Sequence, residues 1–400
     1  MKRKTILIVI ALCGLAASGV GLLMNVSGLF FTPIAEELGL MKGTVSMTLT
    51  VGNICFSIGG LLCPKVIAKY RMKLVLIFAT SMMAGGTALL SICNSIVLMY
   101  IFHALRGLAA GLAGFVFITL VINQWVHKNV GFITSITMGF SGLAGALFSP
   151  IVSAVIQSSG WRMAYLLVAA MIVLLNLPAI FFVPPMSVRT REKDEEDDTG
   201  KKKTKTRSYS VIMVVIVAVY SACACGAAAL AQHFPGIVSE RNLPVAVGAT
   251  MLSISMVMNT GGKMILGILV DKIGAKRSLP LFSILVMLSL LLLMFVPVSF
   301  AMYAAAAFYG LCFAMSTVGV VSMTRDRFGM ENYADTYPKI SLCGSASNAI
   351  FTAVIGFLYD ASGSYRLTMF MMLSMEIIAF LIIVYVYHTI AKAKKAGKEA

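Results

Sequence analysis

The 400-residue sequence contains few charged residues and very few acidic ones, which excludes most classes of soluble protein. Only 12% of its residues are charged, and 16 are acidic against 32 lysines and arginines. A soluble domain typically carries about 25% charged residues. The four histidines and eight cysteines show no metal-ligand spacing and no CxxC pair, so we predict no metal site and no disulfide framework. There is also no phosphate-binding glycine loop or nucleotide-binding domain, so we predict no catalytic residues, no cofactor and no enzyme activity.

Long apolar segments fill the sequence instead. Hydrophobic residues make up 59% of the chain, and the mean hydropathy is +0.92. Apolar runs of about 20 residues recur throughout, and each is long enough to cross a hydrocarbon layer of about 30 Å. The runs lack the ten-residue alternation of a membrane β-barrel, so helices must satisfy the backbone hydrogen bonds. The sequence therefore predicts an all-α membrane protein.

The apolar runs predict twelve transmembrane helices. We expect the first run to remain as a helix, because it is too long for a cleaved signal peptide. The expected ranges are about 5–31, 43–64, 73–93, 96–123, 130–157, 163–184, 210–236, 244–270, 277–297, 299–323, 335–360 and 365–389.

The distribution of positive charge predicts the orientation in the membrane. The net charge of +16 is concentrated in alternate short loops and at the termini, which indicates a cytoplasmic side and not a nucleic-acid partner. Both termini should then be cytoplasmic, in the cell membrane. The charged segment 186–209 predicts a cytoplasmic linker between an N-terminal bundle (1–185) and a C-terminal bundle (210–400). A regulatory or lipid-binding role of this segment is an open alternative.

A compact charged turn follows the eighth predicted helix. The spacing G-x-L-x-D-K-x-G-x-K-R runs from Gly267 through Asp271 and Gly274 to Arg277. It resembles the loop signature of the major facilitator superfamily of secondary transporters. The resemblance implies two six-helix bundles and transport by alternating access, driven by gradients. It also assigns Gly267, Asp271, Gly274 and Arg277 to coupling or gating.

Lys263 is the only lysine deep inside the apolar part of the eighth predicted helix. It precedes Asp271 by eight residues, roughly 12 Å along a helix. A lysine at the middle of a bilayer costs about 2.5–3.5 kcal/mol on insertion scales. We therefore predict that it contacts an anionic substrate, with Asn259 one turn earlier on the same face. A structural ion pair and a lysine that reaches the interface are the alternatives.

Arg106 lies near the middle of the fourth predicted helix. His103 precedes it by three residues and shares its face, and Gly107 and Gly111 form a GxxxG surface that predicts close helix packing. We regard Arg106 as a candidate substrate contact and His103 as a candidate for proton coupling. The alternative is that both side chains only bond polar groups inside the first bundle.

Other polar residues occur in the C-terminal half. The eleventh predicted helix has a polar stripe that includes Asn348, and Tyr220 and Tyr309 lie in the seventh and tenth helices. We include all three as candidate substrate contacts, although packing roles would also explain them. Glu376 is the only acid away from loops and helix ends, and we expect it to face helix packing. The scarcity of acids favours an anionic substrate over a cation.

A second resemblance narrows the expected class. Trp125, Lys128, the glycine-rich segment that follows and the turn Gly160-Trp161-Arg162 are similar to the monocarboxylate-transporter and oxalate:formate-antiporter-like branch. That branch has a carboxylate-binding cation, usually arginine, where Lys263 stands. The resemblance implies a small monocarboxylate as substrate and symport or antiport, with protons as a possible partner. We also expect a monomer in the lipid bilayer. A proton-driven drug exporter and a non-transporting membrane sensor remain alternatives.

Overall fold

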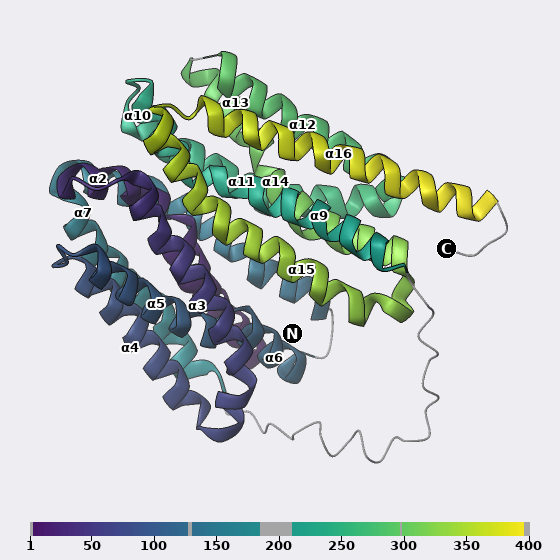
Figure 1. Ribbon diagram of the computed structural model, residues 1–400. Coiled ribbons are helices and arrows are strands. Elements are labelled where there is room, and N and C mark those ends of the chain that lie inside the picture. The colour runs from purple at the N-terminus through teal and green to yellow at the C-terminus, as the bar shows by residue number, and fades with distance from the viewer. Residues whose placement is uncertain (1–2, 127–129, 185–209, 297, 396–400) are drawn as a thin grey trace. The chain divides into compact units, whose positions relative to one another are not determined.

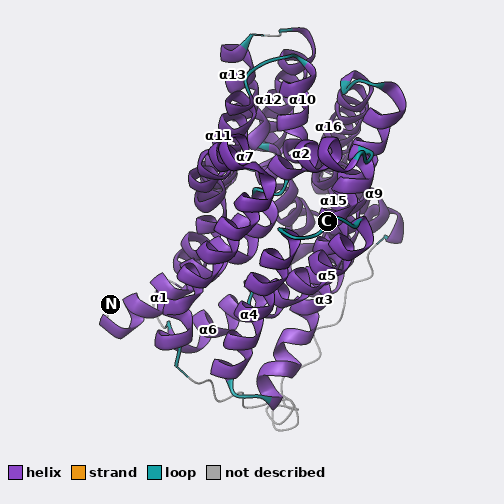
Figure 2. Cartoon of the chain, turned by 90° about the vertical axis from the view of Figure 1, so that its left-hand side faces the viewer, coloured by secondary structure: helices purple, strands orange, loops and turns teal. Residues whose placement is uncertain are grey.

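The computed structural model describes residues 3–126, 130–184, 210–296 and 298–395, and every regular element in these ranges is a helix (Figures 1 and 2). The chain divides into two compact units. One contains Met1–Leu40 and Thr44–Lys203, and the other contains Met41–Gly43 and Thr204–Ala400. The predicted linker 186–209 lies entirely outside the described residues.

The first unit consists of helices that pack around α7. The segments α1 and η1 lie against α7, and α4 packs between α5 and α7. Its elements are α1 (Arg3–Ala16), the π-helical η1 (Ala17–Asn25), α2 (Gly28–Leu38), α3 (Lys42–Lys69), α4 (Met72–Leu90), α5 (Ile96–Leu112), α6 (Phe115–Trp125) and α7 (Val130–Phe182).

The second unit is built around α9, which packs on α15 and α16. A second group places α11 against α13 and α12 against α16, and Figure 1 shows α12 and α16 running side by side. Its elements are α9 (Val211–Ala227), the 3-10 helix η2 (Ala228–His233), α10 (Phe234–Glu240), α11 (Val245–Ile273), α12 (Ala275–Phe295), α13 (Ser299–Gly310), α14 (Cys312–Ala314), the π-helical η3 (Met315–Gly319), α15 (Val320–Ser362) and α16 (Arg366–Lys395).

The helices account for twelve membrane crossings. The described chain contains 11 segments long and apolar enough to span a bilayer. One of them, Ile136–Phe182, has 47 residues, about twice the length that one crossing needs. Gly160 interrupts it with a φ of 82°, a conformation that glycine adopts without a Cβ clash. Two crossings therefore lie in this segment, and the predicted all-α fold with twelve transmembrane helices is confirmed.

Four of the predicted helices are irregular where the sequence predicted continuous ones. The first becomes π-helical over Ala17–Asn25, the fourth breaks between Leu112 and Phe115, the seventh changes to a 3-10 helix over Ala228–His233, and the tenth is π-helical over Met315–Gly319. Every third predicted helix, beginning with the first, is therefore irregular. π-Helical and 3-10 segments depart from the regular α-helical hydrogen-bond pattern and often occur at functional sites, and broken helices commonly form the substrate sites of transporters.

The GxxxG surface of α5 packs directly on α3. A Cβ atom added at Gly107 would overlap the carbonyl of Gly52, and one added at Gly111 would overlap the carbonyl of Phe56. Only hydrogen atoms fit at these two positions. The predicted close packing at this surface is confirmed.

Candidate functional site

Lys263 lies well inside α11, ten residues before its last residue, Ile273. Its side chain is half-buried, and within the described ranges it has no hydrogen bond or ion pair. Asn259, one turn earlier, is 9% exposed, and its buried Oδ1 has no partner there either. Asn259 Nδ2 lies 3.9 Å from Met256 Sδ, and this contact sets the amide orientation because a thioether sulfur can only accept. The pair therefore offers one cation and one acceptor.

Asn348, Tyr220 and Tyr309 all donate to backbone carbonyls in this structure. Asn348 Nδ2 donates to Cys225 O at 2.8 Å, and Tyr309 Oη donates to Ala227 O. Both carbonyls lie in the last turn of α9, where the helix becomes irregular and loses its regular acceptor pattern.

The tyrosines are completely buried as well. Tyr220 Oη donates to Met315 O, the first carbonyl of η3, at 3.2 Å, and both Tyr220 and Tyr309 are 0% exposed. These hydroxyl groups stabilise the irregular segments of the seventh and tenth helices. Substrate contact by Asn348, Tyr220 and Tyr309 stays a prediction.

Arg106 and His103 are buried in the first unit beside a very small cavity. They are 4% and 3% exposed, and they line a cavity of about 10 Å³ together with Asn53, which is about the room for one water molecule. His103 Nδ1 lies 2.9 Å from Met99 O, and the Arg106 guanidinium carbon is 5.9 Å from the ring centre of Tyr165. Arg106 thus places a cation beside this cavity. Roles of Arg106 in substrate binding and of His103 in proton coupling stay predictions.

The charged turn after α11 is exposed. Asp271 and Arg277 are exposed, and among the described side chains Asp271 forms no ion pair. Gly274 has φ 80° and ψ 152°, a region that only glycine readily adopts, so it is required for the turn between α11 and α12. Gly267 has no atom within 4 Å of a built Cβ, so close packing does not explain it in this structure.

The acid of the last helix, Glu376, is fully buried as the sequence predicted. It is 0% exposed and accepts from Ser283 Oγ at 3.4 Å and from Cys312 Sγ at 3.6 Å. No described cation pairs with it. It therefore does not neutralise Lys263.

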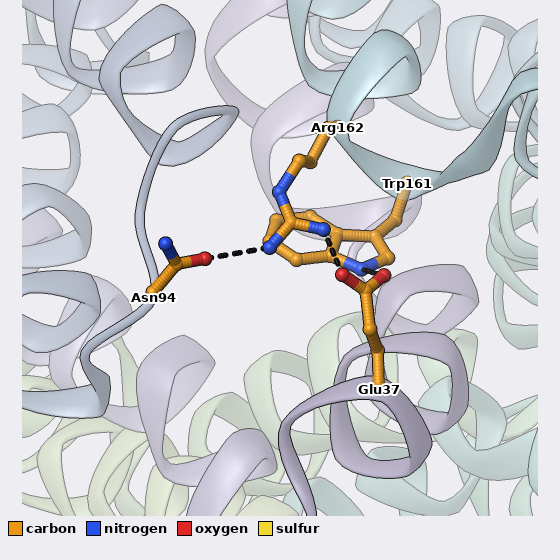
Figure 3. Close-up of polar contacts among 4 residues, drawn as sticks. All are labelled: Glu37, Asn94, Trp161 and Arg162. Atoms are coloured by element: carbon orange, nitrogen blue, oxygen red, sulfur yellow. Dashed lines mark hydrogen bonds and ion pairs between the residues drawn. The ribbon is translucent and has the colours of Figure 1, made fainter.

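Sequence reasoning missed a carboxylate contact in the first unit, which Figure 3 shows. Glu37, near the end of α2, accepts from Trp161 Nε1 at 2.6 Å and forms an ion pair with Arg162, while Arg162 Nη2 donates to Asn94 Oδ1 at 2.6 Å. The side chains of Trp161 and Arg162 directly follow the break at Gly160. The contact joins the end of the first helix of the unit to the start of its sixth.

The second unit has a carboxylate at the matching place, with different donors. Glu240, at the end of α10, accepts from Ser364 Oγ at 2.6 Å and from the backbone N–H of Tyr365 at 2.9 Å, just before α16 begins. When the two halves of the sequence are compared with Asp271 set opposite Ala68, the same spacing sets Glu240 opposite Glu37. An acid at matching positions of the two halves was the signal in the sequence that could have revealed both contacts.

We expect Glu37→Gln to lower stability only slightly, because the ion pair is solvent-accessible. The hydrogen bond from Arg162 lowers the pKa of the Glu37 carboxyl from its ordinary value. The stabilisation is therefore complete above the unfolded pKa of about 4.3 and is lost as the pH falls through the lower folded value. Thermal unfolding in detergent should show a midpoint at neutral pH reduced by no more than about 3 °C.

Glu36→Gln is the matched control, since Glu36 is an exposed neighbour. Its thermal midpoint should equal that of the wild type at neutral pH. The gap between Glu37→Gln and the wild type should close in acid. A gap that stays constant from pH 7 to pH 3 would contradict the ion-pair explanation.

Comparison with known proteins identifies the family. The sequence profile of the Major Facilitator Superfamily matches residues 6–337 and 220–400, which together cover nearly all of the chain. The protein belongs to this superfamily, a class of membrane transporters, as the turn at 267–277 suggested. These comparisons do not extend to the monocarboxylate branch, which stays a prediction.

Solved structures show the same fold at low sequence identity. The chain is similar to the nucleoside transporter NupG (TM-score 0.74, 13% identity, 95% of this chain and 100% of that one). It is also similar to a bacterial homologue of the human lysosomal transporter Spinster in an inward-facing, occupied conformation, with a TM-score of 0.75, 13% identity and 98% of each chain covered. A D-xylose-proton symporter gives a TM-score of 0.72 and 14% identity over 95% of this chain and 96% of that one.

One relative has a closer sequence over a shorter region. The probable sulfoacetate transporter SauU of Cupriavidus necator is 25% identical over 138 residues. The matching region covers 34% of this chain and 32% of the relative.

Proposed function

We propose that this protein is a secondary active transporter that moves a small organic anion, such as a monocarboxylate, across the cytoplasmic membrane by alternating access. The observation that carries the proposal is Lys263, a cation well inside α11 that has no partner among the described residues. Substrate contact at Arg106, Asn348, Tyr220 and Tyr309 belongs to the same proposal.

The charge of Lys263 calls for an anion. Placing a lysine in the middle of a bilayer costs about 2.5–3.5 kcal/mol on insertion scales, so water, a carboxylate or a ligand must compensate it. Glu376 cannot do so, because it is enclosed by its own donors, Ser283 and Cys312. A carboxylate or sulfonate of a substrate would supply the missing charge, and Asn259 Oδ1 would accept a hydrogen bond from a substrate that also carries a hydroxyl group.

The relative named above supports an anionic substrate. Its name refers to sulfoacetate, an organic anion, although the match covers only 138 residues. Coupling to protons and exchange of one anion for another are both compatible with the proposal. We further propose that the protein acts as a monomer with both termini in the cytoplasm.

The proposal is tested by counterflow in proteoliposomes. Vesicles that contain the purified protein and a high internal concentration of one unlabelled compound are mixed with a trace of the same labelled compound outside. We expect small carboxylates and sulfonates to give transient accumulation, while lipophilic cations and neutral sugars should give none. Accumulation of lipophilic cations alone would favour a drug exporter, and no accumulation of any compound would favour a sensor.

Asp271→Asn should lower the transport rate at least about tenfold while changing substrate affinity much less. The reason is that an acid in the last turn of α11 opposes the helix dipole, so we infer that its charge serves a step of the cycle and not the stability of the helix. The measurement is the initial rate of uptake against substrate concentration. Lys272→Gln, a charge removal at the adjacent exposed position, is the control, and equal losses in rate and affinity at Asp271 would count against gating.

A further inference from the structure

A second charged cavity lies at the end of the second unit where α10, α12 and α16 meet. It has a volume of about 220 Å³ and is lined by Glu240, Arg241, Met294, Phe295, Arg366 and Met369. Figure 1 shows the start of α16 beside α10 at this end of the unit. The cavity is smaller than the roughly 300–1,000 Å³ of sites for drug-sized ligands, so it fits a headgroup-sized molecule.

The two arginines of this cavity lack a carboxylate partner. Arg241 Nη2 donates to Leu293 O at the end of α12, but its Nη1 is buried without a partner among the described residues. The guanidinium of Arg366 likewise has no bond in the described ranges, where only its backbone N–H bonds Ser364 Oγ. A buried donor without an acceptor costs about 1–3 kcal/mol, so an anion at this place would be favoured.

Comparison with the first unit shows that arginines without a carboxylate partner are unusual at this place. There, Glu37 forms an ion pair with Arg162, which stands next to the start of the sixth helix. In the second unit Glu240 occupies the matching position, but its two oxygens accept from Ser364 and Tyr365. No ion pair joins Glu240 to either arginine of the described chain. The repeat thus leaves two cations and one acid around the second cavity, with a net positive charge.

We propose that this cavity binds the phosphate of an anionic phospholipid, held between the guanidinium groups of Arg241 and Arg366. Arginine binds phosphate oxygens through paired N–H donors. The remaining walls, formed by Met294, Phe295 and Met369, are apolar.

The surface next to the cavity favours a lipid over a free anion. Phe295 is 62% exposed, and Leu367 and Phe370, which flank Met369 on α16, are 52% and 51% exposed. Exposed apolar side chains on a transmembrane helix face acyl chains. A phospholipid would satisfy both features, with its phosphate at the arginines and its chains along α12 and α16.

The experiment measures ligand-induced stabilisation of the full-length protein in a neutral detergent. Phosphatidylglycerol should raise the thermal midpoint in a saturable manner, while phosphatidylcholine, inorganic phosphate and glycerol phosphate should not. Arg366→Gln should weaken the apparent affinity for phosphatidylglycerol at least about tenfold. This variant should fold normally, because the Arg366 side chain forms no hydrogen bond or ion pair with the described residues. Arg241→Gln should weaken binding similarly.

The double variant Lys69→Gln/Lys392→Gln is the matched control, since it removes two exposed cations outside the cavity and should keep the affinity. Equal affinity of Arg366→Gln and the wild type would overturn the proposal, as would an equal loss in the control. If glycerol phosphate or inorganic phosphate stabilises the protein as well as phosphatidylglycerol does, the cavity is a site for free anions and the lipid assignment is wrong.

Discussion

Lys263→Met should abolish anion transport while leaving the protein folded and inserted. Methionine keeps most of the length of the side chain and removes the charge that would bind the substrate. It also removes the cost of placing a lysine inside the membrane, about 2.5–3.5 kcal/mol on insertion scales, so the yield and thermal midpoint should match or exceed those of the wild type. Uptake of the anion identified by counterflow should fall at least about a hundredfold, which corresponds to the loss of a charge-assisted contact of about 3 kcal/mol.

Two further variants separate charge from geometry. Lys263→Arg keeps the cation and adds a planar group suited to carboxylates, so it should retain transport with altered selectivity. Lys392→Met removes an exposed lysine near the end of α16 and should behave as the wild type. A Lys263→Met protein that carries the anion at a near wild-type rate would show that the lysine is structural, and the anion proposal would lose its main support.

Gly111→Ala should destabilise the first unit strongly. The atoms that a Cβ at Gly111 would meet all belong to the backbone of α3, namely Phe56 O, Gly60 N and Gly59 Cα, and backbone cannot move aside as a flexible side chain can. Alanine favours a helix over glycine by about 1 kcal/mol, but overpacking costs about 1–3 kcal/mol or more. The steric cost should dominate and lower the thermal midpoint in detergent by several degrees.

Gly85→Ala is the matched control in the same unit. Gly85 is exposed on α4, and a Cβ there would meet no atom within 4 Å. Only the helix propensity then changes, so the midpoint should stay or rise slightly. If both variants have the same midpoint, α3 and α5 do not pack as closely as the structure shows.

The sequence alone determined the features that depend on short segments. The length of each apolar run specified the twelve crossings, because the thickness of the hydrocarbon layer sets the length of a helix. The spacing from Gly267 to Arg277 was sufficient to indicate the superfamily. The position of Lys263 within its helix also followed directly, because a helix rises by about 1.5 Å per residue.

Only the tertiary structure decided which polar groups meet. The contacts of Glu37 with Trp161 and of Glu240 with Tyr365 each join residues more than 120 positions apart, and no local pattern encodes such a pairing. The irregular segments of the first, fourth, seventh and tenth helices were equally invisible. Their freed carbonyls are stabilised by donors from other helices, such as Tyr309 on Ala227. Hydropathy records how much apolar surface a segment offers to lipid, whereas a break in a helix depends on whether a neighbouring helix supplies the missing hydrogen bond.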